Sequence, residues 1–310
     1  MGNITSHAKY KRLSSIKKLP EFDHIESEQE RQEKLMDYFF SNDNNSIDRF
    51  HMLHFLRAYI FQSNFSSPIE DKLIEGGCKV INIGCGPGTW LLDLSNKYRN
   101  SYFFGIDVEP IFPKEIKPNN LEFIEADIIN GLSFRDNEFD FTHIDLFRVI
   151  YSTDQWDFIL SELIRVTKPG GYIEVTSRRK EHITEGPIFS KLANAVWTAC
   201  QKLNLDIELV DNLFSKFESQ PNMGNVHLIE KNMIIGPRGG KIGLIAQELA
   251  LSYLNADPLT KFASEELGIS EEEYKNMVEK DLVEELKEKN TEYTHVRFWS
   301  QKQLSLNNDS

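Results

Sequence analysis

Apolar residues along the middle of the chain recur in two alternating patterns, short continuous runs and longer stretches with three- and four-residue spacing. Short runs bounded by turn residues indicate buried strands, whereas the wider spacing indicates amphipathic helices. The strands are predicted over 79–83, 102–108, 121–126, 139–145 and 171–176, and the helices over 89–97, 154–166 and 188–203. Strands that alternate with helices in this way predict a doubly wound, Rossmann-like α/β fold with a mostly parallel sheet.

The flanking regions show different patterns. Residues 26–61 have helical spacing with a break at 41–46, and two strand patterns at 226–235 and 293–299 enclose a helical stretch over 242–289. We expect the last two strands to form an antiparallel edge. The predicted organisation is a disordered basic tail over 1–20, an N-terminal helical cap over 21–68, the main α/β domain over 69–300 with a helical lid insertion at about 241–290, and a disordered C-terminus over 301–310.

Charge and cysteine content narrow the range of functions. The chain of 310 residues has a formal net charge of −13, so the protein as a whole should repel nucleic-acid phosphates, and no nucleic-acid partner is expected. Three cysteines do not make a disulfide framework, which fits a cytoplasmic protein. The cysteines and histidines also lack metal-ligand spacing, so no metal is expected. Cys85 has no base near it in the sequence and is interpreted as a small buried residue, not a nucleophile.

The strongest chemical signal is a glycine-rich turn after the first predicted strand, with glycines at positions 84, 86 and 88. Glycine there lets a ligand approach the backbone at the strand end. A dinucleotide site would have a third glycine where Thr89 stands, so the pattern argues against an NAD-dependent oxidoreductase.

Two acidic residues follow at the ends of the next two predicted strands. Asp107 comes about 20 residues after the turn, where a carboxylate can accept both hydroxyls of a ribose. Asp127 can accept from an adenine amino group, while Ile128 packs on the adenine ring. Together the turn and the two acids indicate a nucleoside-containing cofactor.

The glycine turn and the two acidic residues, followed by a Pro-Gly-Gly turn at 169–171, occur in the order found in class I S-adenosylmethionine-dependent methyltransferases. The chain therefore resembles that family. The segment 61–68 also resembles the group of fungal methyltransferases that includes regulators of secondary metabolism. The resemblance implies that the protein is an enzyme with the cofactor S-adenosyl-L-methionine. It implies a binding site made of Asn82, Gly84, Cys85, Gly86, Gly88, Thr89, Asp107, Val108, Asp127 and Ile128.

Two features near this site bear on catalysis. The family usually has an aspartate where this chain has Asn82, and losing that anion could weaken the binding of a cationic cofactor. His143 and Asp145 are candidate catalytic residues because the resemblance places them beside the transferable methyl group. A histidine near a strand end is, however, more often a packed residue than a base.

The acceptor is expected to be a small molecule, with a protein acceptor as the other possibility. The aromatic residues Tyr59, Phe61 and Phe65 could close an apolar acceptor pocket, although core packing would explain them equally well. The alternative function is a catalytically weak or inactive protein of this fold that regulates through protein contacts.

The first six residues match the M-G-x-x-x-[ST] pattern for N-myristoylation at Gly2. One acyl chain binds membranes only marginally, but a cluster of basic residues between 9 and 18 would supply a second signal. We therefore expect peripheral membrane contact by the tail of an otherwise cytoplasmic protein. The alternatives are a tail that carries no lipid and a basic cluster that acts as a nuclear localisation signal.

Overall fold

The computed structural model describes residues 44–146, 151–202 and 204–304. Gly2, the predicted tail over 1–20, the first part of the helical cap and residues 305–310 lie outside the described residues. The described helix α2 (Asn44–Phe61) includes residues 44–46, so the break predicted over 41–46 is wrong for that part.

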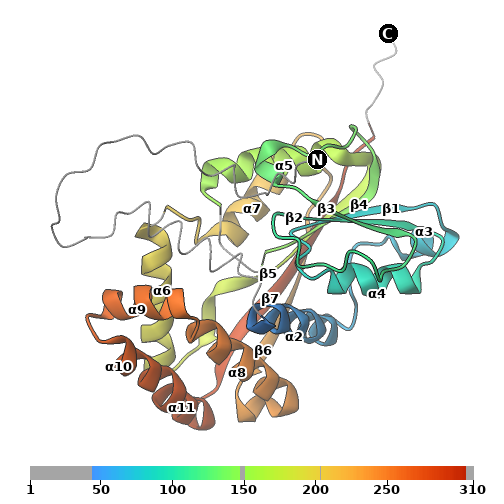
Figure 1. Ribbon diagram of the computed structural model, residues 1–310. Coiled ribbons are helices and arrows are strands. Elements are labelled where there is room, and N and C mark those ends of the chain that lie inside the picture. The colour runs from blue at the N-terminus through green and yellow to red at the C-terminus, as the bar shows by residue number, and fades with distance from the viewer. Residues whose placement is uncertain (1–43, 147–150, 203, 305–310) are drawn as a thin grey trace, which may run out of the picture.

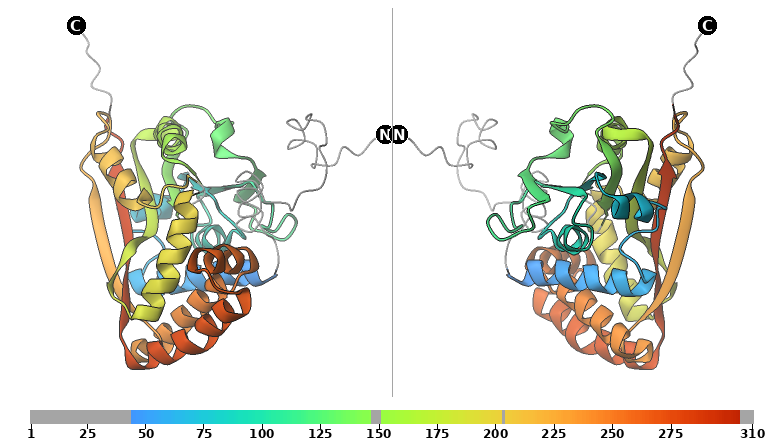
Figure 2. Two further views of the ribbon diagram at one scale, coloured as in Figure 1. Left: turned by 90° about the vertical axis from the view of Figure 1, so that its left-hand side faces the viewer. Right: turned by 90° about the vertical axis from the view of Figure 1, so that its right-hand side faces the viewer.

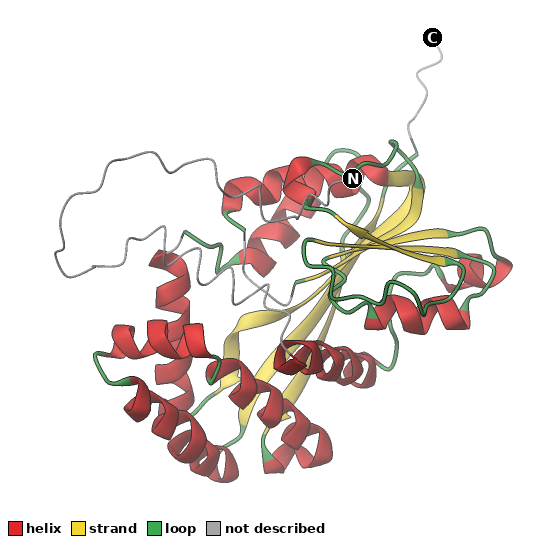
Figure 3. Ribbon diagram, viewed as in Figure 1, coloured by secondary structure: helices red, strands yellow, loops and turns green. Residues whose placement is uncertain are grey.

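Seven strands form one sheet in the order β3-β2-β1-β4-β5-β7-β6, seen as one continuous twisted surface in Figure 3. The first five strands in chain order are parallel, and β7 runs antiparallel to both of its neighbours. The mostly parallel Rossmann-like sheet with an antiparallel C-terminal edge is thus confirmed. The strands are β1 (Lys79–Ile83), β2 (Tyr102–Asp107), β3 (Leu121–Glu125), β4 (Phe139–Asp145), β5 (Thr167–Thr184), β6 (His227–Ile235) and β7 (Thr291–Gln301).

Helices cover both faces of the sheet. One face carries α5 (Thr153–Val166) and α7 (Leu209–Glu218), and the other carries α3 (Glu70–Glu75) and α4 (Thr89–Lys97) (Figure 1). The helix α7 was not predicted. Each layer buries its own apolar cluster, including Trp156 and Leu163 under α5, and Leu91 and Leu94 under α4.

A third apolar cluster joins α2 and α6 (Pro187–Lys202) to the helices inserted between β6 and β7. The inserted helices are α8 (Gly240–Leu254), α9 (Asp257–Leu267), α10 (Glu271–Asn276) and α11 (Leu282–Glu288), with a π-helical turn over Met277–Asp281. Figure 2 shows α2 running alongside this group. The inserted helices pack on α6 and α2. The helix over the glycine turn is α2, whose Phe50 ring lies beside Gly86.

Local sequence explains the start of α10 and an irregularity inside β5. Ser270 begins α10 with a capping box, in which its hydroxyl accepts from the Glu273 N–H and the Glu273 carboxylate accepts from the Ser270 N–H. The predicted Pro-Gly-Gly turn lies inside β5 as an irregularity between the pairs Phe139 with Thr167 and Phe141 with Tyr172. A side chain at Gly171 would stand 2.9 Å from the Asp140 carbonyl oxygen, so the bulge needs glycine there.

Candidate functional site

The glycine turn connects β1 to α4 in a backbone conformation that favours glycine. Gly84, Gly86 and Gly88 have φ angles of +68°, +53° and +76°. A Cβ at Gly84 would meet no atom within 4 Å, whereas a Cβ at Gly88 would stand 2.3 Å from the Phe123 ring. The turn thus presents open backbone at Gly84 and packs closely against β3 at Gly88.

The two predicted acids lie at neighbouring strand ends. Asp107 holds the glycine turn, because its carboxylate accepts from the Gly86 N–H at 2.7 Å and from the Glu109 N–H at 3.0 Å. The N–H of Ala126 donates to the Asp107 carbonyl, which brings Asp127 to the same edge. Asp127 accepts from the Ile129 N–H, and burial raises the pKa of Asp127. Ile128 is buried in the core and Val108 is half-buried.

A cavity opens between the turn and α2, with about 620 Å³ of empty space including its open mouth. The predicted residues that line it are Asn82, Gly84, Cys85, Thr89, His143 and Asp145. The remaining predicted residues, Gly86, Gly88, Asp107, Val108, Asp127 and Ile128, do not line this cavity. Burial raises the pKa of the Cys85 thiol, as expected for an unreactive cysteine.

His143 lies in the floor of the cavity and is 2% exposed. Its Nδ1 lies 3.0 Å from Asn82 Oδ1 and its Nε2 lies 3.2 Å from the Thr176 hydroxyl oxygen. Since the amide oxygen only accepts, Nδ1 donates to it and Nε2 accepts from the hydroxyl. Burial, together with Arg297 and Arg57, holds the pKa of His143 well below 6.5. A neutral ring engaged at both nitrogens suits a positioning role better than that of a general base.

Asp145 forms an ion pair with Arg57 of α2. The Arg57 side chain is 3% exposed, and its Nε and Nη2 have no hydrogen-bond partner in the described part of the chain. Asp145 is therefore the counter-ion of a buried cation. This pairing makes Asp145 a positioning residue for α2, a contact that the sequence alone did not predict.

Helix α2 is held over the turn by hydrogen bonds to α4. Nδ1 of His51 lies 2.7 Å from the Thr89 hydroxyl, and Nε2 of His54 lies 3.0 Å from the Asp93 carboxylate. A Cβ at Gly86 would lie 3.5 Å from the Phe50 ring. Helix α2 thus forms one wall of the cavity.

The segment 62–68, which follows α2, is anchored by three side chains from other elements. The Glu174 carboxylate of β5 accepts from the backbone N–H of Ser66 and Ser67 and from the Ser67 hydroxyl. Arg297 of β7 donates to the Ser63 carbonyl, and the Trp90 indole N–H of α4 donates to the Asn64 carbonyl. Burial raises the pKa of Glu174, although Arg297 and these hydrogen bonds oppose that shift.

Sequence reasoning missed several of these residues. Arg57, Trp90, Thr176 and Arg297 line the cavity, and Glu174 lies beside it. Buried charge is rare, so a polar residue inside an apolar strand run, such as Glu174 or Arg297, was a usable signal. Their partners were not predictable, because the contacts join residues more than 100 positions apart.

The strand order, the glycine turn and the acid at the end of β2 define a class I methyltransferase domain. The family model described as a methyltransferase domain matches residues 80–171. The protein is accordingly an S-adenosylmethionine-dependent methyltransferase, and its cofactor is S-adenosyl-L-methionine.

Similar proteins are found among fungal methyltransferases. The chain is 22% identical over 279 residues to the N-methyltransferase verN of Clonostachys rogersoniana, which covers 86% of this chain and 92% of that relative. It is 21% identical over 200 residues to the methyltransferase str2 of Strobilurus tenacellus, covering 63% of this chain and 72% of str2. It is 28% identical over 97 residues to the secondary metabolism regulator LAE1 of Cochliobolus heterostrophus, covering 31% of each chain.

Among solved structures, the chain is similar to phosphoethanolamine N-methyltransferase 2 of Haemonchus contortus. The TM-score is 0.49 at 16% identity, and the match covers 90% of this chain and 61% of the other.

The residues present fit the cofactor. Gly84 leaves open space at the end of β1, and the Asp107 carboxylate stands at the next strand end beside the turn. Within the described ranges, no group of three or more His, Cys, Asp and Glu side chains is arranged to hold a metal ion. None of the described helices is long and apolar enough to cross a membrane.

Proposed function

We propose that the protein transfers a methyl group from S-adenosyl-L-methionine to a small-molecule acceptor. The cavity between the glycine turn and α2 carries this proposal, because it places open backbone beside a wall of apolar side chains that includes Phe50 and Leu53. Support also comes from verN, whose name describes an N-methyltransferase and which matches 86% of this chain. A protein acceptor is the other possibility.

In this reaction the cofactor supplies an electrophilic methyl group, and the protein orients the acceptor and excludes water. The cofactor-binding roles proposed for this chain are those that the family resemblance implies. The turn over 84–88 with Cys85 and Thr89 would contact the methionine part, and Asp107 with Val108 the ribose. Asp127 and Ile128 would contact the adenine. His143, neutral and fixed by Asn82 and Thr176, would position the reacting groups.

Thermal unfolding in the presence of S-adenosylhomocysteine or NAD tests the cofactor site. A ligand that binds only the native state raises the unfolding temperature, so S-adenosylhomocysteine should stabilise the protein and NAD should not. Stabilisation by NAD alone would contradict the proposal. A turnover assay on candidate acceptors then tests the transfer.

The alternative of a regulatory protein that works through protein contacts draws on the 97-residue similarity to LAE1. It predicts cofactor binding without methyl transfer to any small molecule. The 279-residue similarity to verN favours the enzyme.

We further propose that the N-terminus is myristoylated at Gly2 and attaches a cytoplasmic protein to membranes. The supporting observation is the acceptor pattern next to a basic cluster that includes Lys9 and Lys11. The alternative is that the basic cluster acts as a nuclear localisation signal.

Mass spectrometry of the N-terminal peptide from a eukaryotic host should show a myristoyl group on Gly2, and Gly2→Ala should move the protein from the membrane fraction to the soluble fraction. Ser6→Ala, which also alters the pattern, is expected to weaken the modification. An unacylated Gly2, or equal partitioning of wild type and Gly2→Ala, would remove the membrane proposal.

A further inference from the structure

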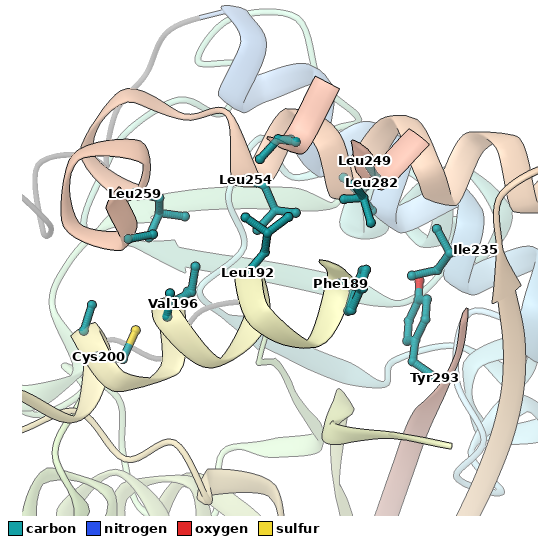
Figure 4. Close-up of a cluster of buried hydrophobic side chains, with 14 of the residues drawn as sticks. Phe189, Leu192, Val196, Cys200, Ile235, Leu249, Leu254, Leu259, Leu282 and Tyr293 are labelled. Atoms are coloured by element: carbon teal, nitrogen blue, oxygen red, sulfur yellow. The ribbon is translucent and has the colours of Figure 1, made fainter. Parts of the chain in front are cut away.

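A second cavity, of about 790 Å³ including its open mouth, lies between α2, α6, α8 and the antiparallel edge of the sheet. Most of its walls are apolar. In Figure 4, Phe189 and Val196 of α6 lie opposite Leu249 of α8, and Ile235 lies beside Tyr293. Concave sites with mostly apolar walls and a few polar groups are typical of pockets for small organic ligands.

The second cavity continues the first along one face of the sheet. Thr176 and Arg297 pair across β5 and β7 and line the first cavity. Arg178 and His295, which form a neighbouring pair on the same face, line the second. Two strand residues span about 7 Å, so the cavities are adjacent. Leu53 of α2 lines both and stands at their junction.

His295 is a buried polar side chain for which the described residues supply no hydrogen-bond partner. It is 0% exposed, and neither ring nitrogen has a hydrogen-bond partner among the described residues. Burial, with Arg57 and Arg178 nearby, holds the pKa of His295 well below 6.5, so the ring is neutral and offers one donor and one acceptor. An unmet buried donor and acceptor cost free energy unless a ligand or water satisfies them.

Arg178 supplies a positive charge in the wall of the same cavity. Its guanidinium lies 5.4 Å from the Trp197 ring centroid, and no ion pair to Arg178 is found within the described ranges. The next two residues do form ion pairs. Arg179 pairs with both Asp211 and Glu230, and Lys180 pairs with Glu208. Of these three consecutive cations, Arg178 is thus the one that faces the cavity without an acidic partner.

We propose that the second cavity is the acceptor site and that its ligand is an aromatic carboxylate. The apolar walls would take the ring, Arg178 the carboxylate, and His295 a further polar group. This inference rests on the proposed methyl transfer. The carboxylate lies at the Arg178 end, so the atom that is methylated lies at the other end of the ligand, near Leu53 and the glycine turn.

Calorimetric titration with 2-naphthoate and with its uncharged analogue 2-naphthamide tests the proposal. Wild type should bind the carboxylate more tightly than the amide. Arg178→Gln should weaken 2-naphthoate binding about tenfold or more and leave 2-naphthamide binding unchanged, because a charge-assisted bond is lost. Arg179→Gln is the matched control, since it removes the same charge one residue away, and it should change neither affinity.

Equal binding of the two probes by wild type, absence of 2-naphthoate binding, or equal affinities in Arg178→Gln and Arg179→Gln would overturn the proposal. S-adenosylhomocysteine is titrated into the same samples. Binding of S-adenosylhomocysteine without 2-naphthoate rejects the acceptor site alone, whereas its failure to bind rejects the proposed function.

Discussion

Asn82 occupies the position where related methyltransferases usually have an aspartate, and its partner is His143. The amide oxygen of Asn82 accepts from a histidine whose pKa is held well below 6.5, so neutral His143 has a neutral partner. An aspartate in this buried place would instead favour a protonated His143. Asparagine in place of aspartate at position 82 therefore favours the neutral form of His143 in the floor of the cavity.

Asn82→Asp is expected to raise the affinity for S-adenosyl-L-methionine or leave it unchanged, because it restores an anion near a cationic ligand. Calorimetry measures the change, with Asn96→Asp on the exposed side of α4 as a control that adds the same charge. A marked loss of affinity in Asn82→Asp would show that the amide is fitted to another ligand geometry.

Asp107→Ala is expected to weaken cofactor binding by about 1.5–3 kcal/mol, the value of a charge-assisted hydrogen bond. Part of the loss would come from the turn itself, since the Gly86 N–H loses its acceptor. Asp157→Ala is the control, because that exposed carboxylate forms a surface ion pair with Lys216 away from the glycine turn. If the affinity of Asp107→Ala matched wild type, this strand end would not belong to the cofactor site.

Asp140 lies at the start of β4 and is 2% exposed. Burial alone would raise the pKa of Asp140, but bonds from Lys168, Lys72 and the Lys79 N–H outweigh it and hold the pKa below its ordinary value. A carboxyl with a lowered folded-state pKa stabilises the protein above the unfolded pKa, and this stabilisation is lost as pH falls through the folded pKa.

Asp140→Asn should therefore lower the free energy of unfolding by about 1.5–3 kcal/mol at neutral pH. The difference from wild type should stay constant from about pH 5 to 7 and shrink below about pH 4, where the carboxyl protonates in the unfolded chain. Urea unfolding at several pH values measures it. A difference that grew on acidification would contradict this account of Asp140.

At the scale of elements, the segment 62–68 helps to fix the position of α2, together with the contacts of α2 to α4 and Asp145. Glu174, Arg297 and Trp90 hold its backbone from three different elements. Because α2 leads directly into this segment, loosening the segment should move the wall that α2 forms in the first cavity.

Glu174→Ala is expected to destabilise the protein by about 3–5 kcal/mol, since it leaves Arg297 buried without its carboxylate and the Ser66 and Ser67 N–H groups unpaired. Glu174→Gln keeps one acceptor and should lose less. Denaturant unfolding gives both values, and S-adenosylhomocysteine affinity should fall more in the alanine variant. Equal stability of the two variants would mean that the acceptor oxygens do not hold the segment.

At the scale of the molecule, the sequence predicted the strands and most helices because their apolar patterns are local. The helix α7 also carried a signal, with Leu209, Leu213 and Phe217 at four-residue spacing and all buried, but it was not recognised. The glycine turn and Asp107 were predicted because a ligand site at strand ends needs them in a fixed order.

What the sequence did not predict are contacts set by the register of the sheet and by the packing of α2 against the sheet. The second cavity depends on the pairing of Arg178 with His295, and the first on Arg57 reaching Asp145 from α2. In both pairs the two residues lie far apart in the sequence, so no local sequence pattern links them. Such contacts arise only when strands and helices distant in the chain are packed together.

The hydrogen bond from Arg297 to the Ser63 carbonyl joins residues 234 positions apart. Strand β7 is the last of the described elements in chain order, and it supplies both this bond and the antiparallel pairing partner of β5. A chain synthesised from its N-terminus contains β1 to β4 before β7, and it lacks Arg297 and His295 until β7 itself has been made. Premature termination before β7 would thus yield a polypeptide that holds the glycine turn but has no closed binding cavities.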